Sequence, residues 1–174
     1  PIIHACLPTE EGIRICAEYG IALAIQSAFI DWPNEPNEYL ESILGDRAAK
    51  LNPFKTYADY GIVQSLGSDG PCTDPDPIGW IHKACNNGTQ SVTVQQALKM
   101  CTYNTCWMSF DEKERGSLEV GKIADMVILY CNPYETDAIQ LDTLKVEQLL
   151  LQGEPYRKIT QNPIGQVIKG LVRK

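Results

Sequence analysis

The sequence predicts an α/β protein in which a parallel sheet is followed by a small β segment. Two observations carry this prediction. Over the first 107 residues, short apolar runs alternate with helical patterns, and the run Ile21 to Ile25 is continuously apolar, as expected for a strand covered on both faces. After this region the chain becomes turn-rich and strand-like. The order strand, helix, strand implies parallel pairing through right-handed crossovers.

The first half of the chain contains three predicted strands, which end at Ile3, Ile25 and Leu66. Three strands do not close a barrel, so they fit either an open sheet or the last part of an eight-stranded one. The first helix begins after Thr9, which can cap it, and ends at Gly20. Its expected buried face consists of Ile13, Cys16, Ala17 and Tyr19.

The remaining elements follow from the same patterns. The expected helices are Glu38 to Leu44, Pro53 to Tyr60, Pro77 to Asn86 and Thr93 to Met108. The expected later strands are Asp125 to Tyr130 and Val146 to Gln152, with a hairpin turn at Gly153 and Glu154 and a returning strand over Tyr156 to Ile159. These elements predict three regions: an α/β region over residues 1–112, a β segment over 113–160, and a basic tail over 161–174.

Composition narrows the class of protein. The content of 44% hydrophobic and 21% charged residues is typical of a globular protein. The net charge of −7 argues against nucleic acid as the main partner, and no apolar run approaches the roughly 18 to 20 residues of a membrane span. The chain opens on Pro1 without a signal peptide or an initiator Met, so we expect it to start inside a larger protein.

The seven cysteines are too few for a disulfide scaffold, and none form a CxxC pair. We expect reduced core thiols in a cytoplasmic protein. Cys72 differs from the others because it stands beside a candidate active-site turn, where it is a candidate for contact with substrate.

Three residues are candidates for chemistry. His4 and Asp69 each follow a predicted strand, where the sites of parallel sheets gather, and glycines flank the Ser68–Asp69 pair. A carboxylate there is suited to binding a metal or deprotonating water. The alternatives are a surface histidine at a strand end and an ordinary turn aspartate. His82 lies inside a helical pattern, where we expect a half-exposed histidine without a catalytic role.

At these residues the sequence resembles the amidohydrolase superfamily, and within it amidohydrolase family 3. The resemblance covers roughly residues 2–158. The most specific part is Gly116 to Leu129, which is similar to the family passage that leads out of the barrel into a small β-sandwich. The other matching stretches are Ile2–Ala5, Ala17–Ile21, Pro53–Lys55, Tyr60–Ile62 and Leu66–Pro71.

The resemblance implies the last strands and helices of a (β/α)8 barrel, followed by part of a β-sandwich. It implies a hydrolase of non-peptide carbon–nitrogen bonds in small amide-type substrates, with one or two divalent metals, often zinc. Asp69 would move protons and, with His4, bind metal. The implied substrate contacts are Gln26, Trp32, Gly70 and Cys72.

The sequence departs from the family pattern because the His-x-His pair, a further ligand histidine and a bridging lysine have no counterpart. We therefore expect an inactive chain without a tight metal site, completed by an N-terminal barrel half or by self-association. The alternative is a non-catalytic folded module or interaction protein derived from an amidohydrolase. An in-frame His-x-His upstream of Pro1 would favour the enzyme, whereas an initiator codon there would favour the module.

Overall fold

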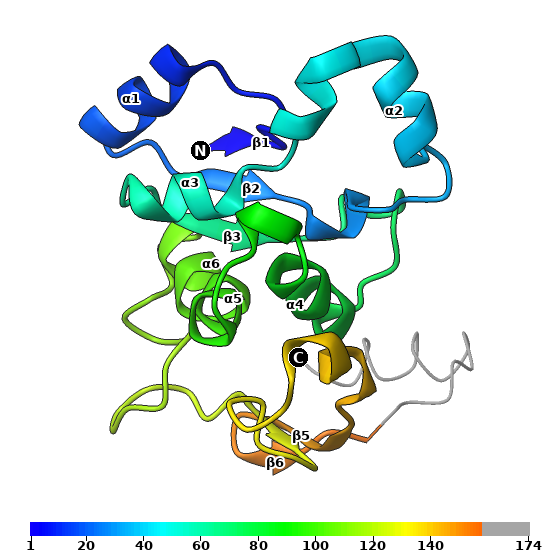
Figure 1. The fold of residues 1–174 in the computed structure, drawn as a ribbon. Helices are drawn as coiled ribbons and strands as arrows, with labels where there is room; N and C mark the ends of the chain where they lie inside the picture. The colour runs from blue at the N-terminus through cyan, green and yellow to red at the C-terminus, as the bar shows by residue number, and fades with distance from the viewer. Residues whose placement is uncertain (158–174) are drawn as a thin grey trace, which may run out of the picture.

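The computed structural model describes residues 1–157 (Figure 1). Its strands form two three-stranded sheets. The strands are β1 (Ile2–Ile3), β2 (Leu23–Ile25), β3 (Gln64–Leu66), β4 (Met126–Leu129), β5 (Val146–Leu151) and β6 (Glu154–Pro155). The α-helices are α1 (Glu10–Glu18), α2 (Asn37–Leu44), α3 (Phe54–Asp59), α4 (Pro77–Cys85), α5 (Val94–Cys101) and α6 (Tyr103–Met108). The 3-10 helices are η1 (Ser27–Phe29), η2 (Gly45–Lys50), η3 (Gly88–Gln90) and η4 (Ala138–Thr143).

The first sheet has the order β1-β2-β3 and all its pairs are parallel. This confirms the predicted strand, helix, strand arrangement. The register pairs Ile2 with Leu23 and Ile25 with Leu66, so the three strands end close together at one edge of the sheet. The side chains that follow these ends therefore share one face of the molecule.

Helix α1 begins and ends where the sequence predicts. The Thr9 hydroxyl accepts a hydrogen bond from Gly12 N at 3.0 Å, and Gly20 takes a φ of 62°, which favours glycine. Ile13 and Cys16 are buried as expected, but Tyr19 is 71% exposed. The prediction for Tyr19 was wrong because this residue caps the helix, where its side chain leaves the packed face.

The helix predicted over Thr93 to Met108 is two helices, α5 and α6. The break is at Thr102, whose φ of −122° and ψ of −93° lie outside the helical region. The Thr102 hydroxyl donates to Leu98 O, and the amide of Asn104 donates to Gln64 O of β3 at 2.8 Å. The contact with β3 redirects the chain, which periodicity within the segment cannot reveal.

The second sheet is antiparallel, with the order β4-β5-β6. Its hairpin turns at Gln152 and Gly153, both with positive φ, one residue earlier than predicted. Tyr156 N still donates to Leu149 O at 2.7 Å. The predicted return at Lys158 and Ile159 and the predicted basic tail lie outside the described residues.

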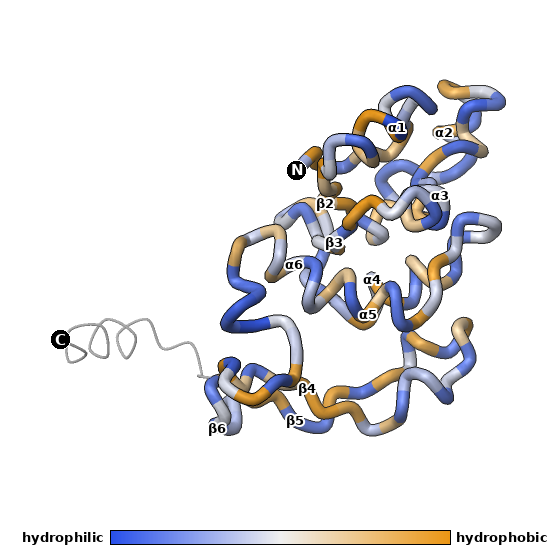
Figure 2. The backbone as a smooth tube through the Cα atoms, turned by 90° about the vertical axis from the view of Figure 1, so that its left-hand side faces the viewer, coloured by the Kyte–Doolittle hydropathy of each residue, from blue (hydrophilic) through white to orange (hydrophobic). Residues whose placement is uncertain are grey.

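The buried core lies between the parallel sheet and its helices. Phe54 and Tyr57 of α3 and Leu23 and Ile25 of β2 are each no more than 1% exposed. Figures 1 and 2 show the antiparallel sheet at the opposite end of the molecule from α1, and Figure 2 shows apolar segments in both sheets. The amide of Asn86 in the turn after α4 donates to Ala138 O of η4, which links the two parts. Within residues 1–157 no helix is long and apolar enough to cross a membrane.

Candidate functional site

His4 and Asp69 face each other across the carboxyl edge of the parallel sheet. His4 directly follows β1, and Asp69 comes three residues after β3. The imidazole Nε2 lies 3.9 Å from Asp69 Oδ2, and the two side chains are 44% and 40% exposed. The sheet thus brings together two groups that are 65 positions apart in the sequence (residues 4 and 69), and both remain open to a small molecule.

Both residues adopt a left-handed backbone, with a φ of 67° for His4 and 52° for Asp69. Ala5, next in the chain, has a φ of 50°. Such conformations cost about 1 to 3 kcal/mol each and tend to cluster at functional sites. The turn after β1 is held in place by the Tyr57 hydroxyl, which donates to Ala5 O at 2.5 Å. Surrounding structure therefore fixes the backbone that presents His4.

Gln26 lies beneath His4 and is only 5% exposed. Its Oε1 is 2.7 Å from His4 Nδ1, and its Nε2 donates weakly to Ala24 O at 3.4 Å. Because an amide oxygen can only accept, Nδ1 carries the proton in this arrangement and Nε2 offers its lone pair toward Asp69. The sequence suggested that Gln26 contacts substrate. Its burial and its bond to His4 favour a positioning role instead.

A row of aromatic rings leads away from His4. The His4 and Phe29 ring centroids are 5.8 Å apart, and those of Phe29 and Trp32 are 5.1 Å apart in a stacked arrangement. Phe29 ends η1, and the loop that follows carries Trp32. The row connects the strand-end pair to a neighbouring cleft.

This cleft has a volume of about 340 Å³ and lies between the η1 loop, the turn after Asp69 and the face of α4. Two residues predicted to touch substrate, Trp32 and Cys72, line it, as do Thr73, Asp74 and Asp76 from the loop that follows Cys72. Gly70 is exposed in the turn between Asp69 and the cleft, and its N–H donates to Ser68 Oγ. The structure thus places Trp32 and Cys72 in the cleft and Gly70 at its approach.

Two cleft residues from α4, Trp80 and Lys83, were missed at the sequence level. The Lys83 ammonium donates to Ala28 O at 3.1 Å and to Ile30 O, and Ser27 Oγ donates to Trp80 O at 2.8 Å. Desolvation lowers the pKa of Lys83, and the charge of Asp31 opposes this shift. The spacing of Asp76, Trp80 and Lys83 places them on one helical face, a signal that could have revealed them.

Cys72 is exposed, and its backbone N–H donates to Asp69 O at 2.9 Å. The pKa of its thiol is raised by desolvation, by the Asp69 charge and by a side-chain hydrogen bond to Asp69.

His82 behaves as a partly exposed helix residue. Its Nδ1 lies 4.0 Å from Asp142 Oδ1, and its side chain is 21% exposed. This contact belongs to the packing of α4 against η4 and does not join the strand-end pair.

An imidazole nitrogen and a carboxylate oxygen are chemically suited to zinc, and here they lie 3.9 Å apart. They are two donors, whereas catalytic zinc sites typically use three protein ligands. Among residues 1–157 no group of three or more His, Cys, Asp or Glu side chains is arranged to hold a metal. The pair therefore fits part of a metal site.

Comparison with known proteins identifies the relationship behind this geometry. The sequence model of the amidohydrolase family, family 3, matches residues 1–156. The chain belongs to the amidohydrolase family. Among curated amidohydrolase relatives, "Putative amidohydrolase YtcJ" of Bacillus subtilis is 28% identical over 167 residues, which are 88% of this chain and 31% of that protein. An N-substituted formamide deformylase of Arthrobacter pascens is 30% identical over 151 residues, 82% of this chain and 26% of that protein.

Solved structures show the same fold. An adenosine deaminase from Xanthomonas campestris with bound zinc matches with a TM-score of 0.66 and 18% identity, over 97% of this chain and 40% of that one. An uncharacterised metal-dependent hydrolase from Pyrococcus furiosus matches with a TM-score of 0.66 and 23% identity, over 77% of this chain and 28% of that one. This amidohydrolase chain thus spans about a third or less of the length of the curated relatives described here.

Proposed function

We propose that this chain is the C-terminal part of a metal-dependent amidohydrolase that hydrolyses a carbon–nitrogen bond, other than a peptide bond, in a small amide-type substrate. The observation that carries the proposal is the pair formed by His4 Nε2 and Asp69 Oδ2 at the carboxyl edge of a parallel sheet. Membership of the amidohydrolase family and a relative named as a formamide deformylase support the reaction class.

The two residues have separate roles in this proposal. His4 contributes Nε2 as a metal ligand, with its tautomer held by Gln26. A bound divalent metal, such as zinc, would supply Lewis acidity that acidifies water and polarises the substrate. Asp69 accepts the proton of the attacking water and passes it to the leaving nitrogen. Its 40% exposure and its place beside the cleft suit contact with both water and substrate.

The missing ligands would come from a part of the protein outside the described residues. The outer edge of β1 supports this, because within residues 1–157 β1 pairs only with β2, and Ile2 and Ile3 are 45% and 61% exposed. An unpaired apolar edge strand favours pairing with another strand.

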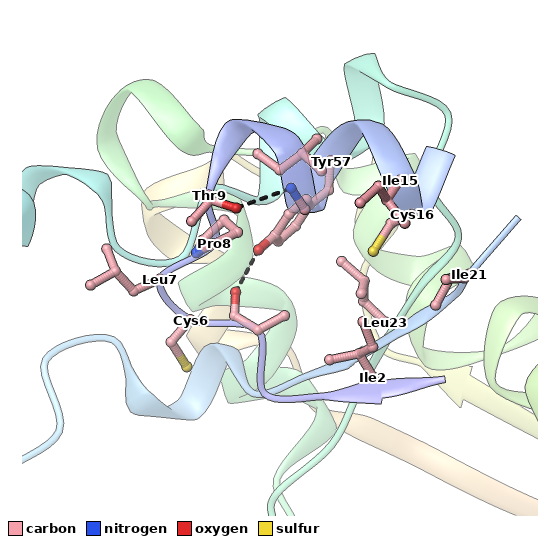
Figure 3. Close-up of a pocket in the computed structure, with 13 residues that line it drawn as sticks. Ile2, Cys6, Leu7, Pro8, Thr9, Ile15, Cys16, Ile21, Leu23 and Tyr57 are labelled. Carbon is pink, nitrogen blue, oxygen red and sulfur yellow. Dashed lines mark hydrogen bonds between the residues drawn. The ribbon is translucent and has the colours of Figure 1, made fainter. Parts of the chain in front are cut away.

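An apolar cavity next to β1 also supports a missing part of the protein at this edge (Figure 3). It has a volume of about 340 Å³, and Ile2, Leu7 and Ile15, each at least 36% exposed, lie along it. Figure 3 shows Ile2 on β1, Ile15 on α1 and Leu7 on the turn that joins them, with the Tyr57 hydroxyl bonded to that turn. We propose that an N-terminal barrel half covers this surface, and that the isolated chain covers it by self-association.

The test compares the 174-residue chain with the longest open reading frame that contains it. Each protein is equilibrated with zinc, dialysed and analysed for bound metal, then assayed against a panel of N-formyl and N-acyl amines. We expect metal and turnover in the longer protein, and neither in the short chain. The matched control is the longer protein carrying His4→Ala, which should lose metal while keeping its circular dichroism spectrum.

Two results would contradict the proposal. Stoichiometric zinc and turnover in the 174-residue chain alone would show that it needs no missing ligands. A longer protein that folds but neither binds metal nor hydrolyses any amide would favour the non-catalytic module. Sedimentation adds a separate check, since a compact monomer of the short chain would rule out its self-association.

A further inference from the structure

The cleft beside Asp69 has two chemically distinct parts. Two indole rings, Trp32 from the η1 loop and Trp80 from α4, line it together with Pro33 and Pro71. Asp74 and Asp76 add two carboxylates, both on exposed residues. Flat apolar walls with acidic groups are suited to a planar ring that is neutral or positively charged.

The one basic residue among those lining the cleft is already engaged. Lys83 donates from its ammonium to Ala28 O at 3.1 Å and to Ile30 O, so these carbonyls take up two of its three N–H donors. It holds the η1 loop against α4 and keeps one N–H donor unused by these two bonds. The carboxylate of Asp74 has no hydrogen-bond or ion-pair partner among residues 1–157. Asp74, Asp76 and Lys83 together give the cleft lining a formal net charge of −1.

One polar group in the cleft wall lacks a partner. The Trp80 indole Nε1 is buried and makes no hydrogen bond within the described part of the chain. A buried donor without an acceptor is uncommon.

The cleft neighbours the strand-end pair, and neither His4 nor Asp69 is among its lining residues. Cys72 lines the cleft and bonds through its N–H to Asp69 O at 2.9 Å, and the rings of His4, Phe29 and Trp32 follow one another in contact. A molecule whose scissile bond lies at Asp69 therefore has this cleft next to it.

We infer that the cleft binds an aromatic substituent of the substrate, neutral or cationic and not anionic. This inference rests on the proposed function, because it assigns a substrate class to the same site. Trp32 and Trp80 stack against the ring, and Asp74 attracts a positive charge attached to it.

The test measures binding directly in the 174-residue chain, without turnover. The probes are phenyltrimethylammonium, phenol, benzenesulfonate and the non-aromatic tetramethylammonium. Tryptophan fluorescence measures the binding of each probe. A Trp107→Phe background removes the third indole, which does not line the cleft. We expect saturable quenching by phenyltrimethylammonium and phenol, and weaker binding of the other two probes. Trp32→Ala should weaken phenyltrimethylammonium binding by about fivefold to tenfold.

The Asp74→Asn variant separates charge from stacking. It should weaken binding of phenyltrimethylammonium by about two- to threefold and leave phenol unchanged, since a single exposed charge contributes modestly. Asp46→Asn, at an exposed position outside the cleft, is the matched control and should change neither. Circular dichroism establishes that each variant is folded, and saturation-transfer NMR of the probe repeats the measurement without relying on fluorescence.

Three outcomes would overturn the inference: no saturable binding of either aromatic probe, binding of benzenesulfonate as tight as that of phenyltrimethylammonium, or tetramethylammonium binding as tight as its phenyl analogue. Aromatic binding without hydrolysis by the longer protein would refute the proposed function and leave the cleft's preference standing. Hydrolysis of aliphatic amides alone by that protein, with no aromatic binding, would refute the inference about the cleft and leave the proposed function standing.

Discussion

His4 Nδ1 lies 2.7 Å from Gln26 Oε1, so a buried amide determines which nitrogen of an exposed imidazole carries the proton. The other nitrogen, Nε2, then faces Asp69 with its lone pair. This relationship connects the interior of the sheet to the candidate metal site, and it can be tested in the chain by itself.

The first prediction concerns this tautomer. We expect the neutral His4 ring to be in the Nδ1–H form, and Gln26→Leu to abolish that preference by removing the acceptor. Gln26→Glu keeps an acceptor oxygen and should restore it. Side-chain ¹⁵N–¹H correlation spectra measure the tautomer, and His82→Gln assigns the signals because the chain has 2 histidines.

Gln95→Leu, an exposed substitution on α5, is the matched control and should leave the His4 signals unchanged. In the longer protein, Gln26→Leu should weaken metal binding by about 10- to 100-fold, as loss of a supporting hydrogen bond typically does. An unchanged tautomer in Gln26→Leu would refute the positioning role.

The second prediction concerns Asp69. Its carboxylate is 40% exposed, so Asp69→Asn should leave the melting temperature nearly unchanged. In the longer protein the same change should lower kcat by about 10²- to 10⁴-fold, because the amide cannot take a proton from water. Asp46→Asn is a control of the same chemical type. Wild-type turnover in Asp69→Asn would show that another group moves the proton.

The third prediction concerns the turn that presents His4. The Tyr57 hydroxyl donates to Ala5 O at 2.5 Å, and the ring is 1% exposed. Tyr57→Phe should lower the free energy of unfolding by about 1 kcal/mol, or somewhat more if Ala5 O stays unsatisfied. Tyr39→Phe, whose ring is 51% exposed, should have no effect. Urea denaturation measures both, and equal stabilities would show that this hydrogen bond does not fix the turn.

The fourth prediction concerns stability at alkaline pH. Desolvation by burial raises the pKa of Cys85 to about 11, and desolvation together with the charge of Cys85 raises that of Cys101 to about 12, from an ordinary value of 9.0. Above pH 9 the unfolded chain loses these thiol protons while the folded chain keeps them. Their stabilising contribution is therefore complete below pH 9 and is lost as the pH rises toward 11 to 12.

Each such thiol should add a slope of about 1.4 kcal/mol per pH unit to the fall in the free energy of unfolding. Between pH 9 and 10, the free energy of unfolding of Cys101→Ala should fall less steeply than that of the wild type, by about that amount. This holds whatever the difference in stability between the two proteins at neutral pH. Cys131→Ala, at an exposed cysteine, is the control. Parallel curves for wild type and Cys101→Ala would contradict the prediction.

Local features of the fold could be predicted because they depend on neighbouring residues. Thr9 and Gly20 bound α1 through a side-chain cap and a left-handed backbone, and the apolar run that contains β2 reveals a strand buried on both faces. Similarly, His4 and Asp69 could be selected because each follows a strand. The family resemblance then gave these positions a chemical meaning.

The sequence by itself determined most of the elements, the parallel pairing of the first three strands and the residue types available for chemistry. Only the tertiary structure decided which of them meet: His4 with Asp69, Gln26 beneath His4, and Trp80 and Lys83 in the cleft. It also divided the predicted helix at Thr102, through a contact with β3. The physical reason is that capping and periodicity act within a few residues, whereas these contacts depend on how separate strands and helices pack.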